Sequence, residues 1–257
     1  MSGRADWLTP DWRVDGVGAL MTTRSGGASS GPYASMNVGG AVGDDAGAVA
    51  ANRALLAAAV GAAPVFLRQV HGTRVVRVDA ADAASGASVH EADALVTSEA
   101  GVACVVQAAD CLPVLLAAPE GRAVAAAHAG WRGLAAGVVE RTLDALCEVG
   151  QCAPGKVVAW LGACIGPDAF EVGDDVLAAF GAVSGQGSGT SARFRSTGDR
   201  KWHADLAGLA RDRLVAAGIA TVGGGAWCTV TDASRFFSYR RDGVSGRMAA
   251  AVWIAAR

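Results

Sequence analysis

Four short apolar runs in the middle of the chain constrain its fold more than any other feature. They cover residues 94–97, 102–107, 114–118 and 123–127, and residues such as Gly, Asp and Pro separate them. Short apolar runs between turn signals are typical of strands that are buried on both faces. We therefore expect an α/β fold with a mixed sheet.

Helical patterns and further strands lie on both sides of these runs. Asp44 or Asp45 can cap a helix that extends to about Val60 and ends at Gly61. The remaining expected elements are strands at 17–22, 66–70, 75–78 and 157–161, helices after 131–133 and at 172–180 and 205–217, a flexible loop at 184–198, and a hairpin around Asp242-Gly243.

Length and composition favour one folded domain over residues 1–257. The chain is 52% hydrophobic and 18% charged, so it can bury a large core. A net charge of −2 provides no overall positive charge that would attract nucleic acid or an anionic membrane. The N-terminal residues carry no signal-peptide pattern and no apolar run is long enough to span a membrane, so a cytoplasmic protein is expected. Its six cysteines include no C-x-x-C pair and are expected to be reduced.

The segment 108–137 concentrates groups with distinctive chemistry. Cys111 and His128 lie in an apolar background, and His71 occupies a turn-like segment upstream. Two imidazoles and a thiolate would supply three ligands of a catalytic zinc site and leave the fourth position open. The spacing alone matches no short metal motif, and cysteine and single histidines are often ordinary core or surface residues.

The same three residues permit other chemistry. A His2Cys set is also the centre of a blue-copper site, although the four histidines of the chain are too few for a multicopper cluster. Cys111 and His128 can instead act as a nucleophile and its base, where the charge of Asp110 would raise the pKa of the thiol.

Five arginines form a second group of candidate functional residues. Arg24 lies in a loop, Arg132 follows His128, and Arg240, Arg241 and Arg247 surround the C-terminal turn. The guanidinium fork matches phosphate or carboxylate, whereas a single arginine is as often a solvated surface residue.

Seven motifs, in order along the chain, resemble one family. They are Thr22-Thr23-Arg24-x-Gly26-Gly27, Gln69-Val70-His71-Gly72, Ala92-Asp93-Ala94, Ala109-Asp110-Cys111-Leu112-Pro113-Val114, His128-Ala129-Gly130-Trp131-Arg132-Gly133, Gly166-Pro167 with Phe170-Glu171-Val172-Gly173, and Phe237-Ser238-Tyr239-Arg240-Arg241-Asp242-Gly243. The sequence resembles the laccase-domain, or polyphenol-oxidase-type, family of purine nucleoside phosphorylases and peptidoglycan editing factors. The resemblance covers a core of about residues 17–254.

The resemblance implies a single catalytic domain, a mixed β-sheet sandwich with flanking helices that is similar to the fold of certain cysteine hydrolases. It implies zinc bound by His71, Cys111 and His128, and cleavage of adenosine, inosine or guanosine by phosphate, with adenosine deaminase and methylthioadenosine phosphorylase side activities. We expect Arg24 to contact phosphate, and substrate contacts from Gln69, Asp110, Arg132, Arg240 and Arg241. A Cys-His hydrolase that edits peptidoglycan precursors and a copper-dependent polyphenol oxidase are the alternatives. The oligomeric state stays open, a monomer included.

Overall fold

Two sheets packed against each other occupy the centre of the protein in the computed structural model, which describes residues 6–84, 86–182 and 189–256. In spatial order, the four-stranded sheet consists of β1 (Val17–Met21), β13 (Met248–Ile254), β5 (Val102–Ala108) and β2 (Ala63–Val65). The six-stranded sheet consists of β12 (Thr221–Gly224), β8 (Val158–Leu161), β6 (Leu112–Ala117), β7 (Val124–Ala129), β4 (Ala94–Thr97) and β3 (Val75–Arg77).

Both sheets contain parallel and antiparallel neighbours. The pairs β2·β5, β3·β4 and β12·β8 are parallel, and the other pairs of these two sheets are antiparallel. The expected mixed sandwich with flanking helices is thereby confirmed.

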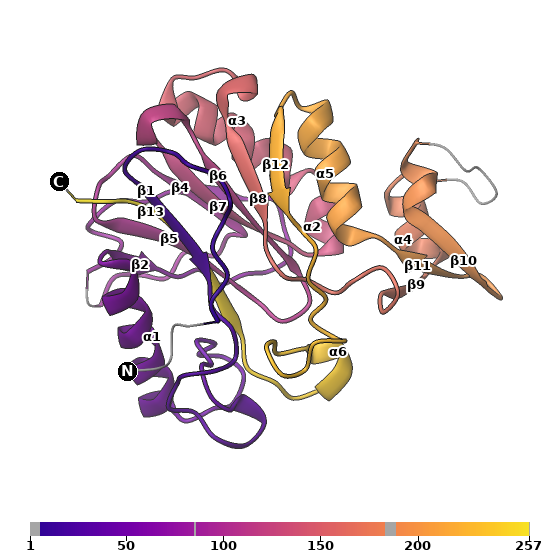
Figure 1. Ribbon diagram of the computed structural model, residues 1–257, viewed down its shortest axis with the longest axis horizontal. Helices are drawn as coiled ribbons and strands as arrows, with labels where there is room; N and C mark the ends of the chain where they lie inside the picture. Colours follow the sequence, from indigo (N-terminus) through magenta and orange to yellow (C-terminus); the bar gives the residue numbers. More distant parts are fainter. Residues whose placement is uncertain (1–5, 85, 183–188, 257) are drawn as a thin grey trace.

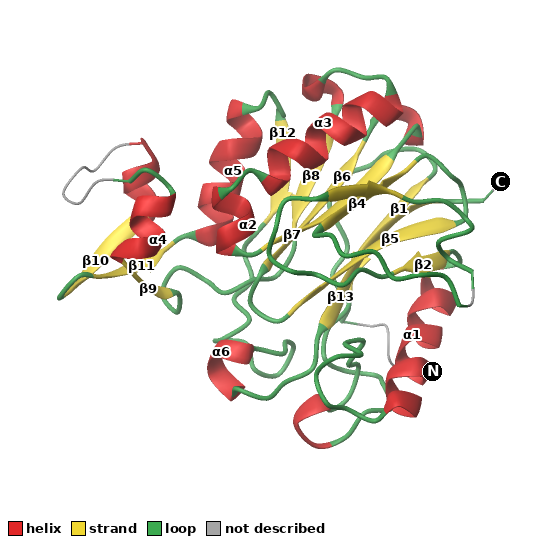
Figure 2. Cartoon of the chain, turned by 180° about the vertical axis from the view of Figure 1, so that it is seen from behind, coloured by secondary structure: helices red, strands yellow, loops and turns green. Residues whose placement is uncertain are grey.

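Helices cover the outer faces of the two sheets (Figures 1 and 2). The α-helices of the described residues are α1 (Ala46–Val60), α2 (Trp131–Ala135), α3 (Val138–Gly150), α4 (Asp174–Ala179), α5 (Leu206–Ala216) and α6 (Tyr239–Asp242), of which α1, α3 and α5 cover these outer faces. One apolar cluster joins α1 to the four-stranded sheet, and another joins α3 and α5 to the six-stranded sheet. A third cluster fills the space between the sheets. Within the described residues, no helix is both long and apolar enough to cross a membrane.

The apolar runs form strands because both faces of each strand are buried. In β6, Val114 and Leu116 face the helix-covered cluster, whereas Leu115 and Ala117 face the space between the sheets. Side chains alternate between the two faces of a strand, so a strand covered on both sides needs an unbroken apolar run. The four runs that the sequence predicts correspond to β4, β5, β6 and β7.

The predicted helix at residues 46–60 is also confirmed. The side chain of Asp45 accepts a hydrogen bond from the backbone N–H of Ala48 at 2.8 Å and so caps α1. Gly61 ends the helix in the left-handed conformation, with a φ of 64°.

Several expected elements differ in the structure. The strand predicted at residues 66–70 is wrong, because Arg68 forms only an isolated bridge with Glu91 and the strand lies earlier, at β2. One helix was expected after Trp131, but Gly137, with a φ of 95°, separates α2 from α3. No hairpin forms at Asp242-Gly243; there Gly243 ends the short helix α6.

A small third sheet protrudes from one end of the sandwich (Figure 1). It consists of β10 (Phe194–Gly198), β11 (Lys201–Ala204) and β9 (Glu171–Gly173), and it packs with α4. The loop expected at 184–198 is therefore wrong for residues 194–198, and its residues 184–188 lie outside the described part. The helix expected at 172–180 starts later, because residues 172 and 173 belong to β9 and α4 begins at Asp174.

Candidate metal centre

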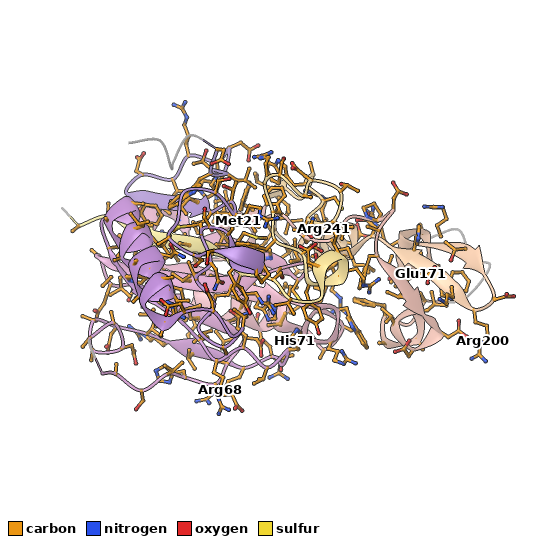
Figure 3. All side chains as sticks on the ribbon, turned by 90° about the horizontal axis from the view of Figure 1, so that it is seen from below. Met21, Arg68, His71, Glu171, Arg200 and Arg241 are labelled. Carbon is orange, nitrogen blue, oxygen red and sulfur yellow. The ribbon has the colours of Figure 1, made fainter. Side chains whose placement is uncertain are left out.

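The antiparallel pairing of β6 and β7 brings Cys111 and His128 together. Cys111 immediately precedes β6, where Pro113 lies opposite His128 in the register. His71 reaches them from the loop between β2 and β3, where a φ of 61° turns the backbone. Figure 3 shows His71 on the main body, away from Glu171 and Arg200 on the protruding sheet. Residues 40 and 17 positions apart in the sequence therefore share one site.

The donor atoms of these residues are close enough to share one metal ion. The ligand atoms of His71, Cys111 and His128 all lie within 4.8 Å of one another, and Nε2 of His71 is 3.6 Å from Sγ of Cys111. A zinc ion with bonds of about 2.0–2.3 Å would bring such donors slightly closer together. The donor set and its geometry therefore fit a tetrahedral ion with one position left for a ligand.

The carboxylate of Asp93 positions both histidines. Its Oδ1 accepts hydrogen bonds from the backbone N–H of His71 at 2.8 Å and from Nδ1 of His128 at 2.9 Å. Its Oδ2 accepts from the backbone N–H of Gly72 at 2.7 Å. Asp93 is fully buried, and these bonds hold its pKa below the usual value although burial opposes the shift. Because Nδ1 is bonded to Asp93, Nε2 is the nitrogen of His128 that remains to bind a metal.

Cys111 and His128 carry opposite charges in the metal-free cluster, because each shifts the pKa of the other. Burial alone would raise the pKa of the Cys111 thiol, but His128, with His71, lowers it to about 6. Burial alone would lower the pKa of His128, but Cys111 and Asp93 raise it to about 9. Near neutral pH the metal-free site therefore contains a thiolate and an imidazolium. Asp110 does not suppress this thiolate, contrary to the expectation from its charge.

Gly130 allows the start of α2 to approach His71 and Cys111 closely. A Cβ atom at Gly130 would lie 2.7 Å from Cδ2 of His71 and 3.1 Å from Sγ of Cys111. Similarly, a Cβ at Gly133 would lie 2.7 Å from the carbonyl oxygen of Gly72. These two glycines let the start of α2 pack directly against the loop that carries His71.

A cavity of about 910 Å³ opens beside the cluster. All three cluster residues line it, together with the aromatic side chains of Trp131 and Tyr239. Its volume is within the usual range for small-molecule sites. A large, partly apolar cavity beside a candidate metal centre is the arrangement of an enzyme site that binds a small organic substrate.

Gln69 and Asp110 line the cavity, but their polar atoms already have partners. The side chain of Gln69 exchanges two hydrogen bonds with the backbone of Gln107, at 2.7 and 2.8 Å. Asp110 accepts from the Thr229 hydroxyl at 2.6 Å and from the backbone N–H of Arg240 at 2.7 Å. Both residues hold the wall of the cavity in place.

The structure divides the four arginines that were expected to contact substrate or phosphate into two groups. Arg132 and Arg240 line the cavity and are exposed. Arg24 and Arg241 are not among the described lining residues. Arg24 donates to the carbonyl oxygens of Ala34 and Ala233, each at 3.0 Å. Arg241 donates to nearby carbonyl oxygens and to its neighbour Asp242. The last two arginines therefore connect loops, and they are not among the residues that line the cavity.

Sequence reasoning did not assign Asp93 to the site. The available signal was a single carboxylate between two alanines, directly before an apolar strand. A charged residue in such a place is rarely buried without partners. Because the partners are backbone N–H groups and a histidine 35 positions away, only the folded chain identifies them.

The fold and the site together define an α/β sandwich protein with a candidate metal centre at the edge of a cavity. The chain belongs to the family described as multi-copper polyphenol oxidoreductase laccase, whose model matches residues 18–255. This match confirms the family resemblance.

Relatives named as purine nucleoside phosphorylases share nearly the full length of the chain. The Pseudomonas aeruginosa purine nucleoside phosphorylase PA4543 is 46% identical over 96% of this chain and 98% of its own length. The Escherichia coli purine nucleoside phosphorylase YfiH is 45% identical, with the same shares covered. The crystal structure of Neisseria meningitidis protein NMB0706 superposes with a TM-score of 0.89 at 45% identity, covering 98% of this chain and 100% of that one.

The close approach at Gly130 leads to a first prediction. Gly130→Ala should push His71 and Cys111 apart and weaken metal affinity about tenfold or more. Removing a residue that supports a metal ligand typically lowers affinity by a similar factor. Competition with a chromophoric chelator measures this affinity. Gly155→Ala is the matched control, because its added Cβ would meet only Gly218 O at 3.5 Å. Equal affinities for the two variants would contradict the packing described for Gly130.

The charge state of the metal-free site leads to a second prediction. Between about pH 6 and pH 9, Cys111 is already ionised whereas His128 carries a proton that a metal must displace. Zinc binding near pH 7.5 should therefore release about one proton, and below pH 6 a second proton, from Cys111, should further weaken binding. Calorimetry in buffers of different ionisation enthalpy measures the release. Binding heats near pH 7.5 that do not depend on the buffer would contradict it.

Proposed function

We propose that this protein is a zinc-dependent purine nucleoside phosphorylase. It would convert adenosine, inosine or guanosine and inorganic phosphate into the free base and ribose 1-phosphate. The observation that carries the proposal is the convergence of the donor atoms of His71, Cys111 and His128 within 4.8 Å at the edge of a large cavity. The names of relatives with 45–46% identity support the substrate class.

In this proposal, His71, Cys111 and His128 hold the zinc ion. When bound, zinc supplies a concentrated positive charge that stabilises negative charge developing on a neighbouring oxygen or nitrogen. Asp93 orients His128 and the His71 loop, so it acts as a positioning residue. Thiolate and imidazole donors favour zinc over magnesium or calcium.

The cavity walls would bind and orient the two substrates. The aromatic rings of Trp131 and Tyr239 offer apolar faces to a purine, and Arg132 and Arg240 add exposed cationic groups. Gln69 and Asp110 support these walls through their bonds to the backbone and to Thr229. Phosphorolysis requires a phosphate oxygen to attack C1′ of ribose while the bond from C1′ to the purine nitrogen breaks.

Adenosine deamination and methylthioadenosine cleavage are proposed as side activities of the same site. Both use the same purine nucleoside framework, so the same cavity would accommodate them. Deamination uses water in place of phosphate, and zinc sites of this kind activate water in other deaminases.

One observation favours a second candidate, a Cys-His hydrolase. Cys111, His128 and Asp93 form a chain in which the thiol has a pKa of about 6 and the histidine is bonded to a buried carboxylate. This is the arrangement of an activated nucleophile with an oriented base. Such an enzyme would act without metal, through a thioester on Cys111, on a peptidoglycan precursor.

Copper-dependent polyphenol oxidation has less support. Only His71 and His128 of the four histidines belong to the cluster. His90 instead bonds to Asp82 at 2.6 Å, and His203 bonds to Arg195 at 2.9 Å. The described residues therefore offer no second group of histidines for additional copper ions.

The proposed function predicts that Cys111→Ala removes both bound zinc and phosphate-dependent cleavage of inosine, while the protein stays folded. Metal analysis, circular dichroism and a coupled assay of base release measure the three properties. Cys147→Ala is the matched control, because this half-buried thiol lies in α3 and does not line the cavity.

Two outcomes would overturn the proposal. Phosphate-dependent cleavage that persists in Cys111→Ala would show that the cluster is not the site. Full activity in chelator-treated wild-type protein, with a thioester trapped on Cys111, would favour the hydrolase.

A further inference from the structure

Two arginines in the cavity are half-buried and have no carboxylate partner among the described residues. Arg53 and Arg247 both line the cavity, and neither forms an ion pair within the described part of the chain. Burial lowers the pKa of both guanidinium groups. Arg68 lines the same cavity but is paired with Glu91. A half-buried cation without a counter-charge favours a ligand that supplies negative charge.

A short backbone segment at residues 38–40 contacts both arginines. Nε of Arg53 donates to the carbonyl oxygen of Val38 at 2.9 Å, and the N–H of Val38 donates to the carbonyl oxygen of Arg247 at 3.1 Å. A Cβ at Gly39 would lie 2.8 Å from Cγ of Arg247, and one at Gly40 would lie 3.3 Å from Nη2 of Arg53. Glycine at these two positions therefore lets both side chains pack against the backbone.

Each guanidinium keeps donors for a ligand. Within the described residues, Arg53 uses only Nε in a hydrogen bond, and Arg247 uses only Nη1, which donates to Ser245 and to the carbonyl oxygen of Gly246. The other N–H groups of both side chains are available. Two forks of this kind match the oxygens of a tetrahedral oxyanion.

The position of Arg247 connects this pair to the metal centre. Arg247 is near enough to Cys111 and Asp110 for their negative charges to oppose the lowering of its pKa. Arg53, Arg247 and the three cluster residues line one continuous cavity. An oxyanion bound by the two arginines would therefore lie in the same space as a substrate at the metal.

We propose that Arg53 and Arg247 form the subsite that binds inorganic phosphate. This inference rests on the proposed phosphorylase function and assigns its second substrate to named residues. Bound there, one phosphate oxygen forms the bond to C1′ of the ribose. The electron pair of the broken glycosidic bond leaves with the purine, which takes up the proton that the attacking phosphate loses. The exposed Arg132 and Arg240 remain for the nucleoside.

Binding of inorganic phosphate to the zinc-loaded protein tests this subsite directly. Arg53→Gln and Arg247→Gln should each raise the Kd for phosphate about tenfold or more in calorimetry, because each removes a charge-assisted contact. Arg247→Lys, which keeps the charge but not the fork, should raise it less. Arg122→Gln is the matched control, because Arg122 is exposed, follows the far end of β6 and does not line the cavity. Circular dichroism verifies that each variant is folded.

Kinetics separates the subsite from the proposed function. In a phosphorolysis assay, the two Gln variants should raise KM for phosphate by a similar factor and leave KM for inosine unchanged. A lower melting temperature with unchanged phosphate Kd and KM would indicate a purely structural role and overturn the subsite. Phosphate binding that depends on both arginines, in a protein that cleaves no purine nucleoside, would instead overturn the phosphorylase and leave an oxyanion site.

Discussion

The carboxylate of Asp93 ties together the two segments that carry the histidines of the cluster. It is fully buried, and it accepts hydrogen bonds from the backbone at His71 and Gly72 and from the ring of the buried His128. A buried carboxylate is stable only when such donors surround it, so the fold must keep them in place. The loop that carries His71 is thereby fixed against β7, and the position of His71 relative to His128 follows from this one residue.

The sandwich supplies the rigid frame around that carboxylate. Strands β6 and β7 are buried on both faces, and their pairing fixes the distance between Cys111 and His128. Polar groups enter only where these strands end, so the chemistry concentrates at the edge of the sandwich, beside the cavity. Two arginines without carboxylate partners in the described residues line the same cavity, so groups of opposite charge share it.

The sequence predicted the central strands because a doubly covered strand leaves an unbroken apolar run. It failed at β10, whose exposed polar residues resemble a loop, and it did not find β11, which pairs with β9 from a distant part of the chain. For the site, spacing alone left His71, Cys111 and His128 as one reading among several, and the family motifs favoured their convergence. Arg24 could not be separated from Arg53 by sequence, because only the folded chain shows which arginine lines the cavity.

X-ray absorption spectroscopy of the metal-loaded protein tests the metal site, because it identifies the atoms that bind the metal. If His71, Cys111 and His128 are the ligands, zinc will show one sulfur at about 2.3 Å and two imidazole nitrogens at about 2.0–2.1 Å. The sulfur signal will be absent in Cys111→Ala. A zinc ion bound only by oxygen and nitrogen in the wild-type protein would contradict the account.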